Sequence, residues 1–224
     1  METMAQLHVI MEHLKIRYGL SRVRLLDVPC GDMLWMSQFL ATRDDIDYTG
    51  IDIVPELINS HRRLFADRLT WKFHVVDIVR DGVGNWSTAD GGDGNYDLVL
   101  SRRMLQHLML SDVMAVLSHL STIRTGDVDR PAFLLASTFA HESTNRELVS
   151  GDAKRGQPLN LLIPPISLTP PLCLGRDYAH GVVSYIGMWS LPVRRVVGCE
   201  HTKPSAISVP GIPQKLYSCV DWSI

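Results

Sequence analysis

Three aspartates recur at a fixed interval in the N-terminal part of the chain, each where an apolar segment typical of a β-strand ends. They are Asp27, Asp52 and Asp77, 25 residues apart in each case. In an open parallel sheet, ligands bind at the carboxyl ends of the strands. A carboxylate at such a place can accept hydrogen bonds from both ribose hydroxyls of a nucleoside, or from an adenine amino group. Any one of these acids alone could be a solvated turn residue or a helix cap, but the three together predict a nucleoside site.

The first aspartate opens the turn Asp27-Val28-Pro29-Cys30-Gly31-Asp32, between a predicted strand and a predicted helix. Gly31 has no side chain, so the backbone can come close to a ligand there. Dinucleotide-dependent oxidoreductases instead use Gly-x-Gly-x-x-Gly to hold a pyrophosphate, and Pro29 and Met33 stand at glycine-like places here. The turn therefore favours a nucleoside cofactor, and an oxidoreductase is the weaker alternative.

The elements that must position these residues alternate in type along the chain. We expect strands over 23–28, 47–53, 73–77, 96–101 and 132–138, and helices over 3–18, 32–41, 55–65, 104–110 and 112–123. This alternation predicts an α/β fold whose mostly parallel sheet is covered by helices on both faces. Two further strand candidates, at 183–189 and 216–222, would extend the sheet to seven strands, and residues 193–199 are a third candidate. Residues 1–224 then form a single domain, with a proline-rich lid or cap at about 140–175.

Composition narrows the class of partner. The chain has 224 residues, 46% of them hydrophobic and 21% charged, and a net charge of −2. It lacks a basic stripe, so we expect no nucleic-acid partner. It also lacks an apolar run of about 18 residues, so we expect no membrane span. The four cysteines are scattered and the histidines form no metal-ligand pattern, which favours a reduced, cytoplasmic protein without a metal site. An oligomer remains open.

One group of proteins has a similar order of motifs. The chain resembles a bacterial-type group of class I S-adenosylmethionine-dependent methyltransferases, whose cofactor loop has the form LD-[IV]-PCGD-x-x-WM. Residues 25–36 of this chain are LLDVPCGDMLWM, and the resemblance continues through 48–54, 77–78, 96–108 and 136–139. It ends with a proline-rich segment at 156–172, similar to the RPLNL…PPF…P-x-PL of that group, and with GMWSL at 187–191, similar to GLW-x-L. It therefore spans roughly residues 23–191.

The resemblance implies a Rossmann-like class I methyltransferase fold and S-adenosylmethionine as the cofactor. It implies that the turn lies under the methionine part of the cofactor and that Asp52 holds the ribose. It also implies adenine contacts from the residues after the second and third strands, and contacts near the transferring methyl or the cofactor carboxylate from those after the fourth. The full set of cofactor-binding residues is Asp27, Pro29, Cys30, Gly31, Asp52, Ile53, Asp77, Ile78, Ser101 and Arg102.

Two positions depart from the pattern of the group. Arg103 stands where the group usually has Asp, and Gln157 where it usually has Arg. If either position orients the acceptor, the substrate or the activity of this chain has changed. A non-catalytic S-adenosylmethionine-binding regulatory protein is therefore the first alternative to an enzyme.

Methyl transfer requires an acceptor held in line with water excluded, and a base only when the acceptor must lose a proton. His107 is the candidate for that base, although a histidine there could also simply pack or cap the helix. The acceptor is expected to be a small molecule or glycan-like compound, methylated at oxygen or nitrogen.

Overall fold

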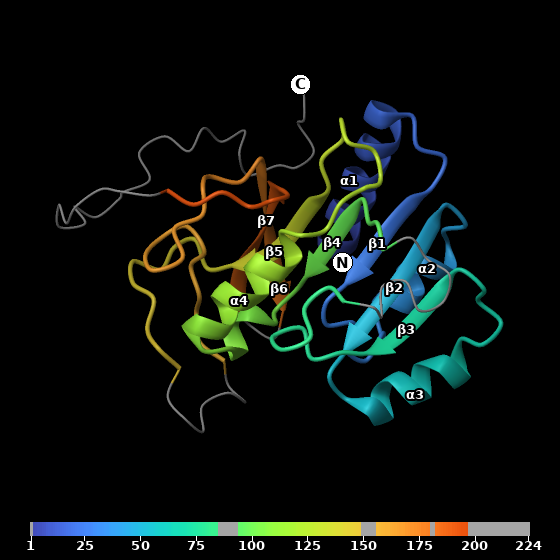
Figure 1. Ribbon diagram of the computed structural model, residues 1–224, viewed down its shortest axis with the longest axis horizontal. Helices are drawn as coiled ribbons and strands as arrows, with labels where there is room; N and C mark the ends of the chain where they lie inside the picture. Colours follow the sequence, from blue (N-terminus) through green and yellow to red (C-terminus); the bar gives the residue numbers. More distant parts are fainter. Residues whose placement is uncertain (1, 85–93, 149–155, 180–181, 197–224) are drawn as a thin grey trace.

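The computed structural model of the chain describes residues 2–84, 94–148, 156–179 and 182–196. Within these ranges the chain forms one sheet of seven strands in the order β3-β2-β1-β4-β5-β7-β6 (Figure 1). The strands are β1 (Val23–Asp27), β2 (Ile46–Asp52), β3 (Trp71–Val75), β4 (Leu98–Ser101), β5 (Phe133–Thr138), β6 (Cys173–Ala179) and β7 (Val182–Ser190). The first five are parallel, while β7 is antiparallel to β5 and β6 is antiparallel to β7.

Helices cover both faces of this sheet. They are α1 (Glu2–Tyr18), α2 (Met36–Ala41), α3 (Pro55–Leu64), α4 (Leu110–Leu120) and the short 3-10 helix η2 (Leu105–His107). One buried cluster joins residues of α1, α2 and α3 to one face, and a second joins α4 to the other. The Rossmann-like α/β fold expected from the sequence, with a mostly parallel seven-stranded sheet, is therefore confirmed. No helix in the described ranges has both the length and the apolar character needed to cross a bilayer.

Strand β6 comes from a segment for which no strand was predicted. Strand β6 includes Cys173 and Leu174, which the sequence placed in the lid, and it pairs with β7 from Cys173 opposite Met188 to Ala179 opposite Val182. It was missed because its sequence, CLGRDYA, does not alternate and carries a glycine and two charged residues. The 193–199 candidate contributes only an isolated bridge between Arg195 and Leu168 in its described part. The 216–222 candidate lies outside the described residues.

Helix α2 begins four residues later than predicted. Gly31 and Met33 have φ values of +56° and +62°, in the left-handed region that a right-handed helix cannot include. Asp32 therefore lies in a turn, where its Oδ1 accepts the N–H of Leu34 at 3.1 Å. Asp32 is therefore not part of the helix predicted over 32–41.

The proline-rich segment packs on the sheet in its described part. Leu159, Leu161, Ile166 and Leu168 are buried in the cluster that also contains α4. The N–H of Leu161 donates to Oγ1 of Thr138 at 3.0 Å, which ties the segment to the end of β5. Over these residues the segment is a strap whose apolar side chains belong to the core.

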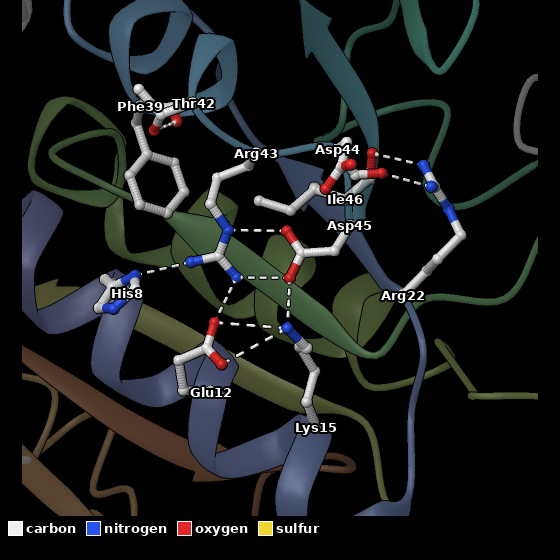
Figure 2. A network of polar contacts seen from close by, with 10 residues as sticks. All are labelled: His8, Glu12, Lys15, Arg22, Phe39, Thr42, Arg43, Asp44, Asp45 and Ile46. Atoms are coloured by element: carbon white, nitrogen blue, oxygen red, sulfur yellow. Dashed lines mark hydrogen bonds and ion pairs between the residues drawn. The ribbon is translucent and has the colours of Figure 1, made fainter.

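Helix α1 is fixed to the sheet by burial and by charge. Its Leu7, Ile10, Met11 and Leu14 are buried, and their spacing places them on one face of the helix. Figure 2 shows the polar side of this attachment, which centres on Asp45 in the turn before β2. Arg43 donates from Nε to Oδ1 and from Nη2 to Oδ2 of Asp45, at 2.7 Å each. Glu12 and Lys15 of α1 complete the network, with Glu12 Oε1 2.6 Å from Arg43 Nη2 and Lys15 Nζ 2.5 Å from Asp45 Oδ2.

Replacing Asp45 tests this network. The hydrogen bond from Arg43, aided by Lys15, holds the pKa of Asp45 well below its usual range despite partial burial. We expect Asp45→Asn to lower the free energy of unfolding by roughly 1–2 kcal/mol at pH 7. Because the native pKa is lowered, this stabilisation is complete above the ordinary value of 3.8 and fades as the pH falls below it.

Urea unfolding at pH 7, 5 and 3 measures the effect. Asp44→Asn is the matched control, because Asp44 is exposed and its carboxylate forms no ion pair with any described residue. Equal stability of the two variants at pH 7 would contradict a stabilising role for the network.

Candidate functional site

The carboxyl ends of the five parallel strands lie along one edge of the sheet. Asp27 ends β1, Asp52 ends β2 and Ser101 ends β4. Asp27 lies opposite Gly50 in the pairing of β1 with β2, and opposite Leu100 in the pairing with β4. The fold therefore brings these predicted site residues to one edge, where open α/β sheets bind their ligands.

The loop after β1 is held by backbone contacts to the strands on either side. The N–H of Val28 donates to the carbonyl of Leu100 in β4 at 2.8 Å, and the N–H of Cys30 donates to that of Ile51 in β2 at 2.9 Å. A Cβ atom built on Gly31 would meet nothing within 4 Å, so the loop presents bare backbone next to open space. This is the feature that the glycine predicted.

Asp52 links this loop to the end of β2. Its Oδ2 accepts the N–H of Gly31 at 3.2 Å, and its Oδ1 accepts the N–H of Val54 at 3.0 Å. Each carboxylate oxygen has more than one acceptor position, so capacity remains for two hydroxyl groups. The side chain of Ile53 is 60% exposed beside it. Bare backbone, an oriented carboxylate and an exposed apolar side chain fit the ribose and the base of a nucleoside.

His61 of α3 supports the loop from beneath, and sequence reasoning missed it. Its Nε2 lies 2.7 Å from the carbonyl oxygen of Gly31, so this nitrogen carries the proton and donates. The imidazole is 3% exposed and packs on Phe73 with ring centroids 5.3 Å apart. The only available signal was its position three residues after the buried Ile58 on an amphipathic helix.

Asp27 is buried rather than open to a ligand. It is 3% exposed, and its Oδ2 accepts the hydroxyl of Tyr48 at 2.9 Å. Burial raises the pKa of Asp27 to about 7, although the hydrogen bond from Tyr48 and the charge of Arg102 act in the opposite direction. A carboxyl that gains or loses its proton near neutral pH thus lies directly below the loop.

Asp77 and Ile78 form the turn after β3. Oδ1 of Asp77 accepts the N–H of Val79 at 3.1 Å, and Oδ2 lies 3.5 Å from Nε of Arg80. Ile78 is buried in the core, and its carbonyl oxygen lies 2.8 Å from Nδ1 of His119. The main visible role of Asp77 is to hold its own turn, and adenine contacts by this pair stay a prediction.

The segment after β4 holds two adjacent arginines around one buried carboxylate, that of Asp177 in β6. Arg102 approaches Oδ1 of Asp177 to 2.8 Å and lies over the ring of Trp35, 5.5 Å from its centroid. Arg103 approaches Oδ2 to 3.3 Å. Burial alone would raise the pKa of Asp177, but the hydrogen bond and charge of Arg102 keep it below its usual value. Sequence reasoning missed Asp177 because β6 was not predicted.

Ser101, immediately before these arginines, is fully buried. Its Oγ has no hydrogen-bond partner among the described residues. Its predicted contact with the cofactor is untested by this arrangement.

A cavity of about 410 Å³ opens beyond Arg103. Apolar and polar side chains contribute to its wall, which is formed by Arg103, Gln106, His107, Phe139, Gly156, Gln157, Pro158 and Val182. The fold thus brings His107, the predicted base, into one wall with Arg103 and Gln157, the two positions that depart from the group's pattern. The N–H of Gln157 donates to the carbonyl of Gln106 at 2.9 Å, which fixes the strap against η2.

A second cavity, of about 490 Å³, lies beside the start of β5 and contains none of the predicted site residues. It is lined by residues 124 and 126–132 together with Leu191 and Pro192, at the edge of the sheet opposite to the strand ends described above. In the described part of the chain, no three His, Cys, Asp or Glu side chains gather as a metal site.

Comparison with known proteins agrees with this arrangement. Residues 26–124 match a family model described as a methyltransferase domain. No curated protein matches the sequence. The solved structures with a similar fold include the following three, which are 11–17% identical to this chain. The N-methyltransferase NodS from Bradyrhizobium japonicum WM9, in complex with S-adenosyl-L-homocysteine, is 11% identical with a TM-score of 0.53, over 84% of this chain and 87% of its own.

Magnesium protoporphyrin IX methyltransferase from Synechocystis PCC 6803, with bound S-adenosylmethionine, is 16% identical with a TM-score of 0.50. The match covers 84% of this chain and 80% of that protein's chain. WbdD, in a co-crystal structure with a kinase inhibitor, is 17% identical with a TM-score of 0.56, over 83% of this chain and 40% of WbdD. These likenesses show that the fold is that of class I methyltransferases.

Asp27→Asn tests the buried carboxyl. Folded Asp27 keeps its proton up to about pH 7, whereas in the unfolded chain it loses the proton near 3.8. The wild type therefore loses stability relative to the variant as the pH rises through this window, by up to about 1.4 kcal/mol per pH unit. Denaturant unfolding of both proteins at pH 5, 6, 7 and 8 gives the difference between their free energies of unfolding. The pH-dependent contributions of other titratable groups are the same in both proteins and cancel in this difference. A difference that is independent of pH would contradict the raised pKa.

Proposed function

We propose that this chain is an S-adenosylmethionine-dependent methyltransferase that binds the cofactor over the ends of β1 and β2 and the acceptor in the cavity beside His107. The observation that carries the proposal is the contact of Asp52 with the N–H of Gly31, at the point where bare backbone meets open space. It is supported by the methyltransferase-domain match over this segment, and by similar folds whose structures hold S-adenosylmethionine or S-adenosylhomocysteine.

In this proposal the ribose hydroxyls donate to Asp52, and the exposed Ile53 packs against the adenine. Asp77 and Ile78 lie near the adenine edge, with the backbone at Ile78 as the contact because its side chain is buried. Residues 29–31 form the floor under the methionine part. Ser101 and Arg102 lie beside the transferring methyl group or the cofactor carboxylate.

When bound, the cofactor supplies an electrophilic methyl group on a positively charged sulfur. The protein must then hold an oxygen or nitrogen of the acceptor in line with that methyl and exclude water. The described wall of the cavity provides apolar surface from Phe139, Pro158 and Val182, and polar contacts from Arg103, Gln106 and Gln157. His107 accepts the proton that a hydroxyl or amine acceptor loses, which makes it the proposed catalytic base.

Replacement of Asp52 tests cofactor binding. We expect Asp52→Ala to weaken the binding of S-adenosylhomocysteine by about 10²- to 10⁴-fold, because it removes two hydrogen bonds to a charged group, each worth roughly 1.5–3 kcal/mol. Asp52→Asn, which keeps one acceptor oxygen, should be affected less. Isothermal titration calorimetry gives the affinities, and thermal unfolding shows whether each variant is folded.

Asp47→Ala is the matched control, because Asp47 is on the same strand but pairs with Arg22 at its other end. NAD and FAD should give no heat with the wild type. Unchanged affinity in Asp52→Ala would overturn the ribose assignment, and binding of NAD would favour the oxidoreductase.

Replacement of His107 tests catalysis separately. With methyl-labelled S-adenosylmethionine and an acceptor found in a metabolite panel, we expect His107→Gln to lower kcat by about 10²- to 10⁴-fold. The affinity of the variant for S-adenosylhomocysteine should stay unchanged, because His107 lies on the acceptor side of the proposed site. His8→Gln is the control, because His8 lies on α1 next to Arg43. A near-normal kcat would rule His107 out as the base, and cofactor binding without turnover of any panel member would favour the regulatory protein.

A further inference from the structure

Arg102 and Arg103 share a single carboxylate, and they share it unequally. Oδ1 of Asp177 receives Nη2 of Arg102 at 2.8 Å and Nε of Arg102 at 3.3 Å, together with the hydroxyl of Thr3 at 2.7 Å. Oδ2 receives Nε of Arg103 at 3.3 Å and the hydroxyl of Ser184 at 3.5 Å. Arg102 makes the shorter contact and donates from two nitrogens, so the carboxylate of Asp177 mainly neutralises the charge of Arg102.

Among the described residues, the charge of Arg103 is therefore incompletely balanced. Its Nη2 reaches only uncharged oxygens, the carbonyl of Val182 at 3.4 Å and the hydroxyl of Ser184 at 3.2 Å. Its Nη1 donates to no described residue, and Asp177 is the one carboxylate in the described ranges that pairs with either arginine. Two guanidinium groups against one carboxylate leave one positive charge, with the Arg103 side chain only 17% exposed.

The two arginines face different parts of the site. Arg102 lies over Trp35, next to the cofactor loop, whereas Arg103 is part of the wall of the 410 Å³ cavity. Arg103 has a φ of +57°, a strained value for a residue with a side chain, and its N–H donates to Oγ of Ser137 at 3.0 Å. The backbone is thus held in an unfavourable conformation that directs consecutive arginines to separate places.

The rest of the cavity wall limits what can lie against Arg103. Phe139, Pro158 and Val182 supply apolar surface. Gln106 Oε1 and Gln157 Nε2 are buried in this wall without a hydrogen-bond partner among the described residues. A cavity of this volume is in the usual range for small-molecule sites. Its wall combines an apolar side with a positive charge that no second described carboxylate balances, and with two amide atoms that have no hydrogen-bond partner among the described residues.

We propose that the methyl acceptor is a small organic carboxylate with a compact apolar body, whose carboxylate pairs with Arg103. The pairing uses Nη1 of the guanidinium, which donates to no described residue, and the accepting oxygen or nitrogen then lies towards His107. This inference rests on the proposed function, because it takes the cavity to be the acceptor site of a methyltransferase.

Matched acid and amide pairs test the proposal. The probes are 4-hydroxybenzoate with 4-hydroxybenzamide, 3-phenylpropanoate with 3-phenylpropanamide, and octanoate with octanamide. Their affinities are measured by calorimetry on the full chain saturated with S-adenosylhomocysteine. We expect at least one acid to bind at least tenfold more tightly than its amide. Arg103→Gln should abolish the difference, and Arg103→Lys should keep part of it because a charge remains.

Arg124→Gln is the control for a general loss of positive charge, because Arg124 lies at the opposite edge of the sheet and donates to backbone carbonyls. It should leave the preference for acids unchanged. The affinity of Arg103→Gln for S-adenosylhomocysteine, within twofold of wild type, shows that this variant is folded. If the wild type fails to bind S-adenosylhomocysteine, the proposed function fails. If it binds that compound but no acid binds more tightly than its amide, or if Arg103→Gln keeps the preference, only the present inference is overturned.

Discussion

The carboxylate of Asp177 has no exposed surface, and a charge in such a place is stable only when it is paired. Its partners come from three separate parts of the chain: Thr3 at the start of α1, Arg102 and Arg103 after β4, and Ser184 in β7. The need to satisfy one buried group thus fastens the N-terminal helix and the antiparallel pair β6–β7 to the end of the parallel sheet. The positions of both arginines follow from it, and with them the boundary between the loop after β1 and the cavity beside His107.

The pKa values of two buried aspartates in the same region shift in opposite directions, because different groups donate hydrogen bonds to their carboxyl oxygens. Asp27 receives a hydrogen bond from the neutral hydroxyl of Tyr48, which does not offset its burial, and its pKa rises to about 7. Asp177 receives two guanidinium groups, which more than offset its burial, so its pKa falls. Arg102 is common to both environments, because its charge also lowers the pKa of Asp27. A change in the contacts of Arg102 would therefore alter the charge below the loop as well as the charge beside the cavity.

Local sequence patterns were sufficient to predict the parallel half of the sheet and part of the candidate site. The strand ends at Asp27 and Asp52 could be placed because apolar segments of strand length precede them, and Gly31 because a tight turn needs it. Strand β6 could not be predicted, since its stability comes from pairing with β7 and from contact with α1, including the bond from Nε2 of Gln6 to the carbonyl of Arg176. Asp177 and Thr3 are 174 residues apart, and His61 meets Gly31 across 30, so no local spacing signals either contact. The late start of α2 depends on the left-handed conformation of Met33, which its residue type does not favour.

The division of the site into two walls has a consequence for specificity. In the proposed arrangement, contacts to the cofactor come from the ends of β1 and β2 and depend on the backbone and on one carboxylate, so many acceptors are compatible with the same cofactor half. The cavity wall instead comes from the segments after β4 and β5 and from the turn side of β7, which belong to different parts of the chain. Arg103 and Gln157, the two departures from the pattern of the resembling group, both lie in this second wall and neither lies in the first. Under this proposal, a change of acceptor can arise by substitution in the cavity wall alone, while the strand ends proposed to hold the cofactor stay as they are.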